Sequence, residues 1–175
     1  VVFHDYDIQR LTNGRGAVNK RAAGDLKTVP LMYGGGAGIP MLSEVLDIIG
    51  GKVPVLIEIK DQDGALGPEV GTLEAAVADA GNAYSGPVAV MSYTPHSDAA
   101  MQTLAPDVPR GLVTEYFRDE DWCIPEARRI TLRQIRDFEK VGACFVSHNR
   151  RDLQCARKSQ LKTQGARELS WTIRS

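Results

Sequence analysis

Residues 53–60, VPVLIEIK, are the stretch from which the fold class is predicted. The run is short, almost continuously apolar and rich in β-branched residues, which is typical of a strand buried in a parallel sheet. Because side chains alternate along a strand, Leu56, Glu58 and Lys60 share one face. We therefore predict a strand that carries a carboxylate and an ammonium group on one face near its carboxyl end.

Five further apolar runs accompany this one along the chain. They lie at residues 1–4, 87–93, 110–115, 142–148 and 169–173. Helical patterns between them are predicted at residues 41–49, 69–80, 97–104, 131–141 and 150–163. Strand runs that alternate with helices at this spacing indicate βα units and a parallel sheet.

The number of units favours an α/β fold of the (β/α)₈ TIM-barrel type. Six units in this chain give about 29 residues per unit, near the roughly 31 of a 250-residue barrel. Two βα units of an eight-unit barrel would then be absent from the sequence. An open doubly wound sheet fits the same count, but its first βα turn usually carries a glycine fingerprint, which this sequence lacks.

The charge and composition of the chain argue against nucleic acid and membranes as binding partners. Of the 175 residues, 21 are basic and 22 acidic, a balance that provides no broad positive surface for nucleic acid or an anionic membrane. No apolar run is long enough for a transmembrane helix, so we expect no membrane insertion. The three cysteines have no CxxC spacing and favour reduced thiols in the cytoplasm. A periplasmic location stays open, because the sequence begins without a methionine.

Glu58 and Lys60 are the first candidates for chemistry. Burying one unpaired charge costs several kcal/mol, so an inward pair needs each other, a metal ion or an anionic ligand. A structural ion pair is therefore the alternative to a catalytic role. His4 ends the first predicted strand, at the barrel face where active sites form, and could act there as a general acid or base. His96 and His148 also follow strands, but a structural role is favoured for both.

Several motifs occur in an order that resembles the glycerophosphodiester phosphodiesterase family. They are VVFHD (1–5), QRLTNGRGAV (9–18), LKTV (26–29), IPMLSEVLDII (39–49), PVLIEIK (54–60), VAVMSY (88–93) and WTIRS (171–175). Gln9, Met41 and Tyr93 depart from the residues that are usual in the family pattern, and none of these departures removes catalytic chemistry. The resemblance extends over most of the chain.

The resemblance implies a (β/α)₈ barrel that hydrolyses glycerophosphodiesters to sn-glycerol 3-phosphate and an alcohol. One divalent cation, Mg²⁺ or Ca²⁺, would be held by three carboxylates, of which Glu58 matches one. His4 matches one of two catalytic histidines and Lys60 the lysine that approaches the phosphate. Tyr93 and Trp171 match aromatic residues that line the substrate pocket, with core packing as the alternative.

The same comparison implies that part of the site lies outside this sequence. A His-Arg-Gly motif and a Glu-x-Asp pair are expected before Val1, so residues 1–175 would form a single, partial barrel domain. This domain would lack the first two βα units and the C-terminal end. Two other functions stay open: a related phosphodiesterase that acts on lysophospholipids, and a non-catalytic remnant that binds a phosphodiester.

Overall fold

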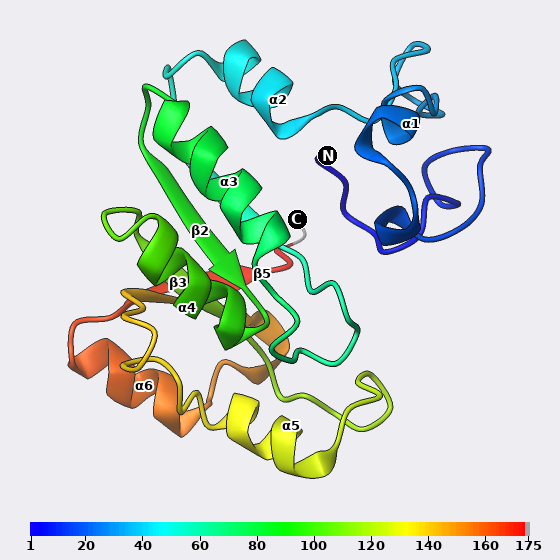
Figure 1. Ribbon diagram of the computed structural model, residues 1–175. Helices are drawn as coiled ribbons and strands as arrows, with labels where there is room; N and C mark the ends of the chain where they lie inside the picture. Colours follow the sequence, from blue (N-terminus) through cyan, green and yellow to red (C-terminus); the bar gives the residue numbers. More distant parts are fainter. Residues whose placement is uncertain (174–175) are drawn as a thin grey trace. The chain divides into compact units, whose positions relative to one another are not determined.

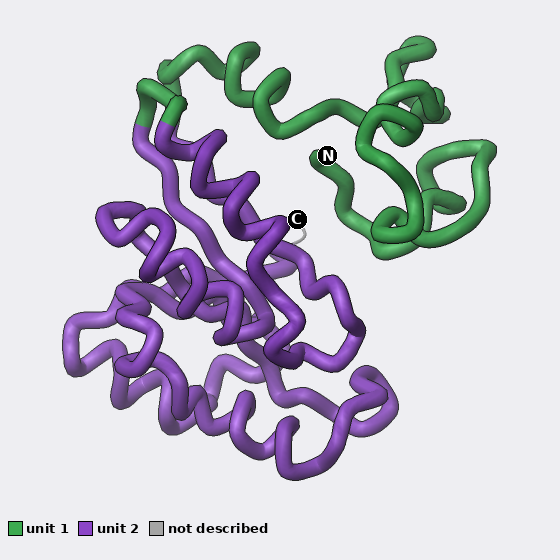
Figure 2. Tube along the Cα trace, in the orientation of Figure 1, with its two compact units in different colours: residues 1–53, 83–86 green, residues 54–82, 87–175 purple. Residues whose placement is uncertain are grey.

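A computed structural model describes residues 1–173 of the protein. The chain divides into two compact units (Figure 2). The first comprises residues 1–53 and 83–86, and the second comprises residues 54–82 and the chain from residue 87 onward. None of the helices in the described part of the chain has the length and apolarity needed to cross a bilayer.

The second unit contains a parallel five-stranded sheet in the order β1-β2-β3-β4-β5 (Figure 1). The strands are β1 (Val55–Ile59), β2 (Val88–Ser92), β3 (Arg110–Thr114), β4 (Phe145–Asn149) and β5 (Arg167–Trp171). Each strand pairs in parallel with the next one in the chain. The predicted α/β class is therefore confirmed, and the sequential parallel order is the one that a partial (β/α)₈ barrel requires.

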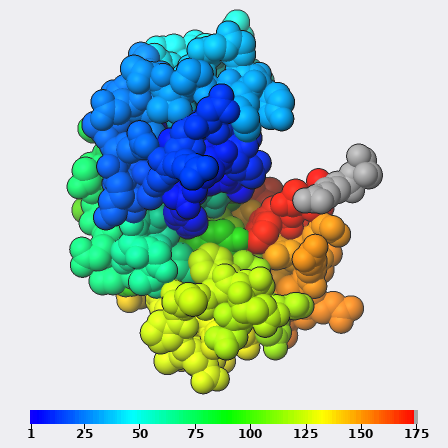
Figure 3. Space-filling model, turned by 90° about the vertical axis from the view of Figure 1, so that its right-hand side faces the viewer, coloured from blue at the N-terminus to red at the C-terminus, as the bar shows by residue number. Residues whose placement is uncertain are grey.

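Helices connect successive strands of this unit. They are α3 (Thr72–Ala83), α4 (Pro95–Leu104), α5 (Glu126–Arg133), the short 3₁₀-helix η2 (Arg150–Asp152) and α6 (Ala156–Thr163). One sheet face packs against these connections, and Leu112 and Val146 meet Ile135, Phe138 and Leu161 there in a buried core. In the space-filling view β5, in red, lies at the surface beside the orange segment that contains α6 (Figure 3).

The helix predicted at residues 131–141 is displaced toward the N-terminus. Helix α5 spans Glu126–Arg133, and the chain then turns through Gln134 and Ile135. Ile135 has a φ of 49°, in the left-handed region that an α-helix cannot contain. These turns place Ile135 and Phe138 in the core, where both are at least nine-tenths buried. Tertiary burial thus decides where the helix ends.

The region predicted as one helix at residues 150–163 is also divided. Residues 150–152 form η2, and α6 begins only at Ala156. The side chain of Asn149 accepts a hydrogen bond from the backbone N–H of Arg151 at 3.0 Å. This local bond stabilises a turn at the end of β4 and competes with a continuous helix.

The first unit contains η1 (Val18–Lys20), α1 (Ala23–Lys27) and α2 (Leu42–Ile49). Helix α2 agrees with the helix predicted at 41–49. It ends at Gly50, which adopts a φ of 58° suited to glycine. Its first turn is closed by the Met41 N–H, which donates to Glu44 Oε2 at 2.9 Å. Ile8, Leu26 and Ile39 form the core of this unit.

The strand predicted at residues 1–4 is wrong. The structure assigns no strand there, and the Val2 N–H donates to the Pro40 carbonyl at 2.8 Å. Val1 and Phe3 instead pack against the core of the first unit. The run is apolar because its side chains pack onto this local core. It does not form the hydrogen bonds of a strand. His4 consequently does not lie at the end of a strand.

Candidate active site

One face of the sheet carries a set of polar and aromatic side chains at its carboxyl end. The register aligns Glu58 with Met91, Met91 with Gly111, Gly111 with Phe145, and Phe145 with Arg167. Because side chains alternate, residues an even number of positions further along each chain project to the same face. These carboxyl-edge residues are Glu58, Lys60, Tyr93, Glu115, Asn149 and Trp171.

Glu58 and Lys60 meet as the alternation predicts. The Lys60 Nζ donates to Glu58 Oε1 at 2.7 Å, and each side chain retains about a quarter of its accessibility (24% and 25%). The ammonium group is therefore fixed beside the carboxylate while both remain accessible to a small ligand. This geometry is compatible with a structural ion pair and with a site for a cation and a phosphate.

Glu115 connects the other members of the set. Its Oε1 accepts from the Trp122 Nε1–H at 3.0 Å and from the Tyr93 hydroxyl at 3.4 Å, and its Oε2 accepts from the Asn149 amide at 3.2 Å. Both carboxylate oxygens therefore already have donors. This arrangement suits a residue that holds its neighbours in place better than one that binds a metal ion.

Aromatic rings pack around the same position. The Tyr93 ring lies 5.0 Å from Trp122 and 5.9 Å from Trp171, measured between centroids. The Trp171 Nε1–H donates to the Ser147 carbonyl at 3.0 Å, which fixes the indole against β4. Tyr93 and Trp171 are thus brought together at the carboxyl end of the sheet, and both stay partly exposed.

Sequence reasoning missed Glu115, Trp122 and Asn149 as members of this cluster. The available signal for Glu115 was a glutamate directly after the apolar run 110–114, at a strand end where barrel enzymes place functional groups. Trp122 lies in a charged loop and gave no comparable signal. Asn149 became significant only once the register of β4 placed it beside Glu115.

His4 belongs to the first unit and forms a separate hydrogen-bonded group. Its Nδ1 lies 2.7 Å from Asp5 Oδ1, and its side chain is 75% exposed. Arg10 donates to both oxygens of Asp5, through Nε at 2.5 Å and Nη2 at 2.8 Å. These Arg10 hydrogen bonds, together with His4, lower the pKa of Asp5 to about 2.

The charge on Asp5 assigns the tautomer of His4. A carboxylate only accepts hydrogen bonds, so Nδ1 carries the proton and Nε2 keeps its lone pair available for proton transfer. A carboxylate that orients a histidine in this way is a recurring element of hydrolytic sites. Asp5 and Arg10 are therefore two further positioning candidates that the sequence did not single out. His4 lies in the first unit and Glu58 and Lys60 in the second, so their meeting in one site stays a prediction.

The other two histidines have different surroundings. His148 is 1% exposed, and its Nδ1 lies 2.7 Å from Thr114 Oγ1. It follows Ser147 on β4 and therefore projects to the face opposite the carboxyl-edge residues. His96 is the second residue of α4, and burial lowers its pKa. Neither histidine belongs to the carboxyl-edge group.

Comparisons with known proteins point to one family. A search among curated protein sequences gives no match. Among solved structures, a phosphodiesterase of Oleispira antarctica in complex with the product sn-glycerol-3-phosphate superposes with a TM-score of 0.77 at 20% identity. That superposition covers 99% of this chain and 67% of the other. A glycerophosphodiester phosphodiesterase of Parabacteroides distasonis gives a TM-score of 0.69 at 16% identity, with 99% and 65% covered.

The chain thus spans about two thirds of the length of these structural relatives. At such identities the superpositions show a shared fold. The family model described as "Glycerophosphoryl diester phosphodiesterase family" matches residues 1–175, the whole chain. The chain belongs to the glycerophosphoryl diester phosphodiesterase family.

Proposed function

We propose that the protein that carries this chain hydrolyses glycerophosphodiesters to sn-glycerol 3-phosphate and an alcohol with the help of a divalent cation. The observation that supports this most directly is the Glu58–Lys60 pair, with 2.7 Å between Oε1 and Nζ, at the carboxyl end of β1. Family membership supports the same reaction class. The product that accompanies the Oleispira antarctica relative, sn-glycerol-3-phosphate, is a molecule that this reaction would release.

Glu58 fits the hard cation that the family implies. It offers a partly exposed carboxylate, the group that Mg²⁺ and Ca²⁺ prefer. One carboxylate does not complete the coordination of either ion, and the oxygens of Glu115 are engaged by other donors. We therefore expect the remaining carboxylates from the Glu-x-Asp pair that the family pattern implies. The bound cation would polarise a phosphate oxygen and offset charge in the transition state.

The residues of this chain would bind the phosphate, transfer the proton and position the substrate. Lys60 would place a positive charge against the phosphate. His4 would move a proton through Nε2, either to the leaving alcohol or from the attacking hydroxyl. Tyr93 and Trp171 would form the apolar wall that positions the small-molecule substrate and excludes water. In this proposal residues 1–175 are one partial barrel domain, and the three free cysteines favour a cytoplasmic protein.

The test is release of glycerol 3-phosphate from glycerophosphocholine by the purified protein, with and without EDTA. We expect turnover that EDTA abolishes and that Mg²⁺ or Ca²⁺ restores. A parallel assay with lysophosphatidylcholine distinguishes the lysophospholipid alternative, because preference for that substrate would contradict the proposal. Substrate binding without turnover at any cation concentration would instead identify a non-catalytic remnant.

A further inference from the structure

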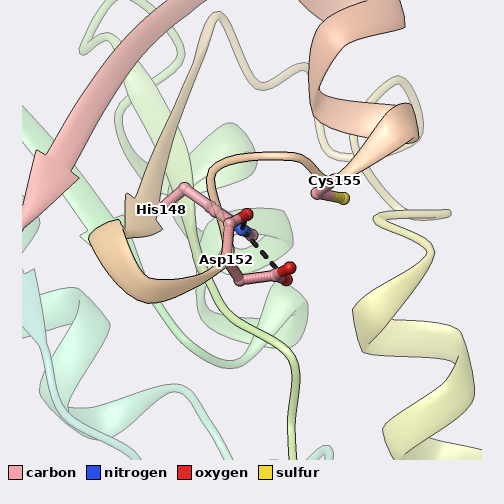
Figure 4. A group of neighbouring side chains, drawn as sticks. All are labelled: His148, Asp152 and Cys155. Atoms are coloured by element: carbon pink, nitrogen blue, oxygen red, sulfur yellow. Dashed lines mark hydrogen bonds and ion pairs between the residues drawn. The ribbon is translucent and has the colours of Figure 1, made fainter.

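Three side chains with metal-binding chemistry meet where β4 continues into α6 (Figure 4). His148 lies near the end of β4, Asp152 in η2 and Cys155 directly before α6. One nitrogen of His148, one oxygen of Asp152 and the sulfur of Cys155 all lie within 4.8 Å of one another. We propose that these three residues form a site for a soft divalent cation such as Zn²⁺, distinct from the cation site at Glu58.

The hydrogen bonds of His148 select its metal-binding nitrogen. Nε2 lies 3.3 Å from Asp152 Oδ2 and 2.7 Å from the Asp152 main-chain oxygen, whereas Nδ1 lies 2.7 Å from Thr114 Oγ1. In the metal-free state Nε2–H donates to the Asp152 carbonyl, and Nδ1 accepts from the Thr114 hydroxyl. With metal on Nε2, the ring proton moves to Nδ1 and is donated to Thr114 Oγ1. A metal-bound histidine usually has an acceptor of this kind for its second nitrogen.

The cluster needs only a small contraction to surround an ion. Metal–ligand bonds of 2.0–2.3 Å in a tetrahedron separate the ligand atoms by about 3.3–3.8 Å, so the widest pair must close by about 1 Å. The connection that carries Asp152 and Cys155 can make this adjustment, because Leu153 and Gln154 between them are both exposed. His148 is buried and fixed by Thr114, and therefore supplies the rigid member of the site.

The donor set determines which ion is favoured. A thiolate and an imidazole bind Zn²⁺ much better than Mg²⁺ or Ca²⁺, which prefer oxygen ligands. Three protein ligands leave a fourth position for water. The site lies on the sheet face opposite Asn149 and Glu115, because His148 and Asn149 are successive strand residues. Its expected role is to tie the end of β4 to the start of α6.

Cobalt(II) titration of the reduced 175-residue chain tests the proposal, because Co²⁺ substitutes for Zn²⁺ and reports its ligands in its absorption spectrum. We expect one equivalent of Co²⁺ to give a tetrahedral d–d spectrum with a thiolate charge-transfer band, and Zn²⁺ to displace it. Cys155→Ser should remove the charge-transfer band. The matched control Cys144→Ser changes an exposed cysteine outside the cluster and should keep the band.

Two further measurements keep the test decisive if changes at the buried His148 prevent folding. Thr114→Val removes the acceptor for Nδ1–H and should weaken Zn²⁺ binding by about 10- to 100-fold while the charge-transfer band survives. Zn²⁺ should raise the thermal midpoint of the wild-type chain more than that of Cys155→Ser, whereas any rise with Mg²⁺, which would report the site at Glu58, should be equal in the two. Absence of the band in the wild type, or an equal band in Cys155→Ser, would overturn the proposal.

Discussion

The Nζ of Lys60 lies 2.7 Å from Oε1 of Glu58, two residues earlier on the same face of β1. A pair that retains about a quarter of its accessibility contributes roughly 0–1 kcal/mol to stability, discounted for screening by solvent. Such a small contribution makes a purely structural role a weak explanation for two charges on the sheet face that carries the carboxyl-edge residues. The two interpretations of the pair also give opposite outcomes on mutation.

Glu58→Gln should lower turnover steeply, and high Mg²⁺ or Ca²⁺ should restore part of it, because the change removes one charged ligand from the cation. Lys60→Ala should lower turnover by about 10²- to 10³-fold, as expected for loss of one electrostatic group, without rescue by metal. Turnover and thermal midpoint are to be measured side by side, with and without EDTA. If both variants mainly lose thermal stability and EDTA has no effect, the pair is structural.

His4→Ala should lower turnover by about 10²- to 10⁴-fold, because it removes a proton-transfer group, and added metal should not restore it. Unimpaired turnover would exclude His4 from catalysis.

Asp5→Asn tests the orientation of His4 without removing its ring. Asn can donate to Nδ1 and so favours the other tautomer, in which Nε2 carries the proton. Turnover should therefore fall although His4 is present. The pKa of Asp5 is about 2, so Asp5 stays ionised across the assay range. Turnover of Asp5→Asn equal to that of the wild type would contradict a positioning role for Asp5.

The sequence predicted those features whose cause is local. Four runs between residues 53 and 148, and the last run with a shift of two residues, became strands because each is apolar enough to be buried in a parallel sheet. The alternation that pairs Glu58 with Lys60 is likewise a property of one strand. Gly50 ended α2 as expected, since its left-handed conformation is local.

The features that sequence reasoning missed depend on contacts between distant segments. Residues 1–4 have a strand-like pattern, but their apolar side chains pack onto a local core. Helix α5 ends early because Ile135 and Phe138 are drawn into the core beneath β3 and β4. The Glu115 cluster joins Tyr93 and Asn149 across 22 and 34 residues, which only the register between strands can bring together.

Asp98→Asn should stabilise the protein at pH values above about 4. Asp98 lies in α4, is 1% exposed, and neither carboxylate oxygen has a hydrogen-bond partner among residues 1–173. Burial raises its pKa well above the usual 3.8, and this effect outweighs the attraction of Arg110. The folded state therefore binds the proton of Asp98 more tightly than the unfolded state does, and the contribution of Asp98 to stability falls as the pH rises above about 4.

The gain from Asp98→Asn should accordingly be close to zero below about pH 4. It should grow by up to about 1.4 kcal/mol per pH unit until the pH reaches the folded-state pKa. Urea unfolding of both proteins between pH 4 and pH 8 measures this difference. Asp107→Asn is the control, because it makes the same change at an exposed position in the loop after α4. A constant difference at every pH would contradict the assignment.

Gly111→Ala should destabilise the sheet, because the ring of Phe145 lies over the glycine. A Cβ at residue 111 would lie 2.3 Å from Phe145 Cδ2 and Cε2, closer than real contacts allow. Since Phe145 is itself buried, moving its ring should cost about 1–3 kcal/mol. Gly81→Ala provides the matched control. Its Cβ would meet Val88 Cγ1 at 3.7 Å, an ordinary contact, and alanine should stabilise α3 by about 0.5–1 kcal/mol.

The double variant Gly111→Ala/Phe145→Leu determines whether the ring is the cause. Leucine is smaller than the aromatic ring, so its presence should relieve the overlap, and the two changes together should cost less than the sum of their separate effects. Urea midpoints of the two single variants and the double variant give this coupling. Additive costs would show that the penalty at Gly111 comes from the backbone of β3. A combined cost below the sum would instead confirm the register that aligns Gly111 with Phe145, and with it the row of residues that places Glu58 and Trp171 on one face of the sheet.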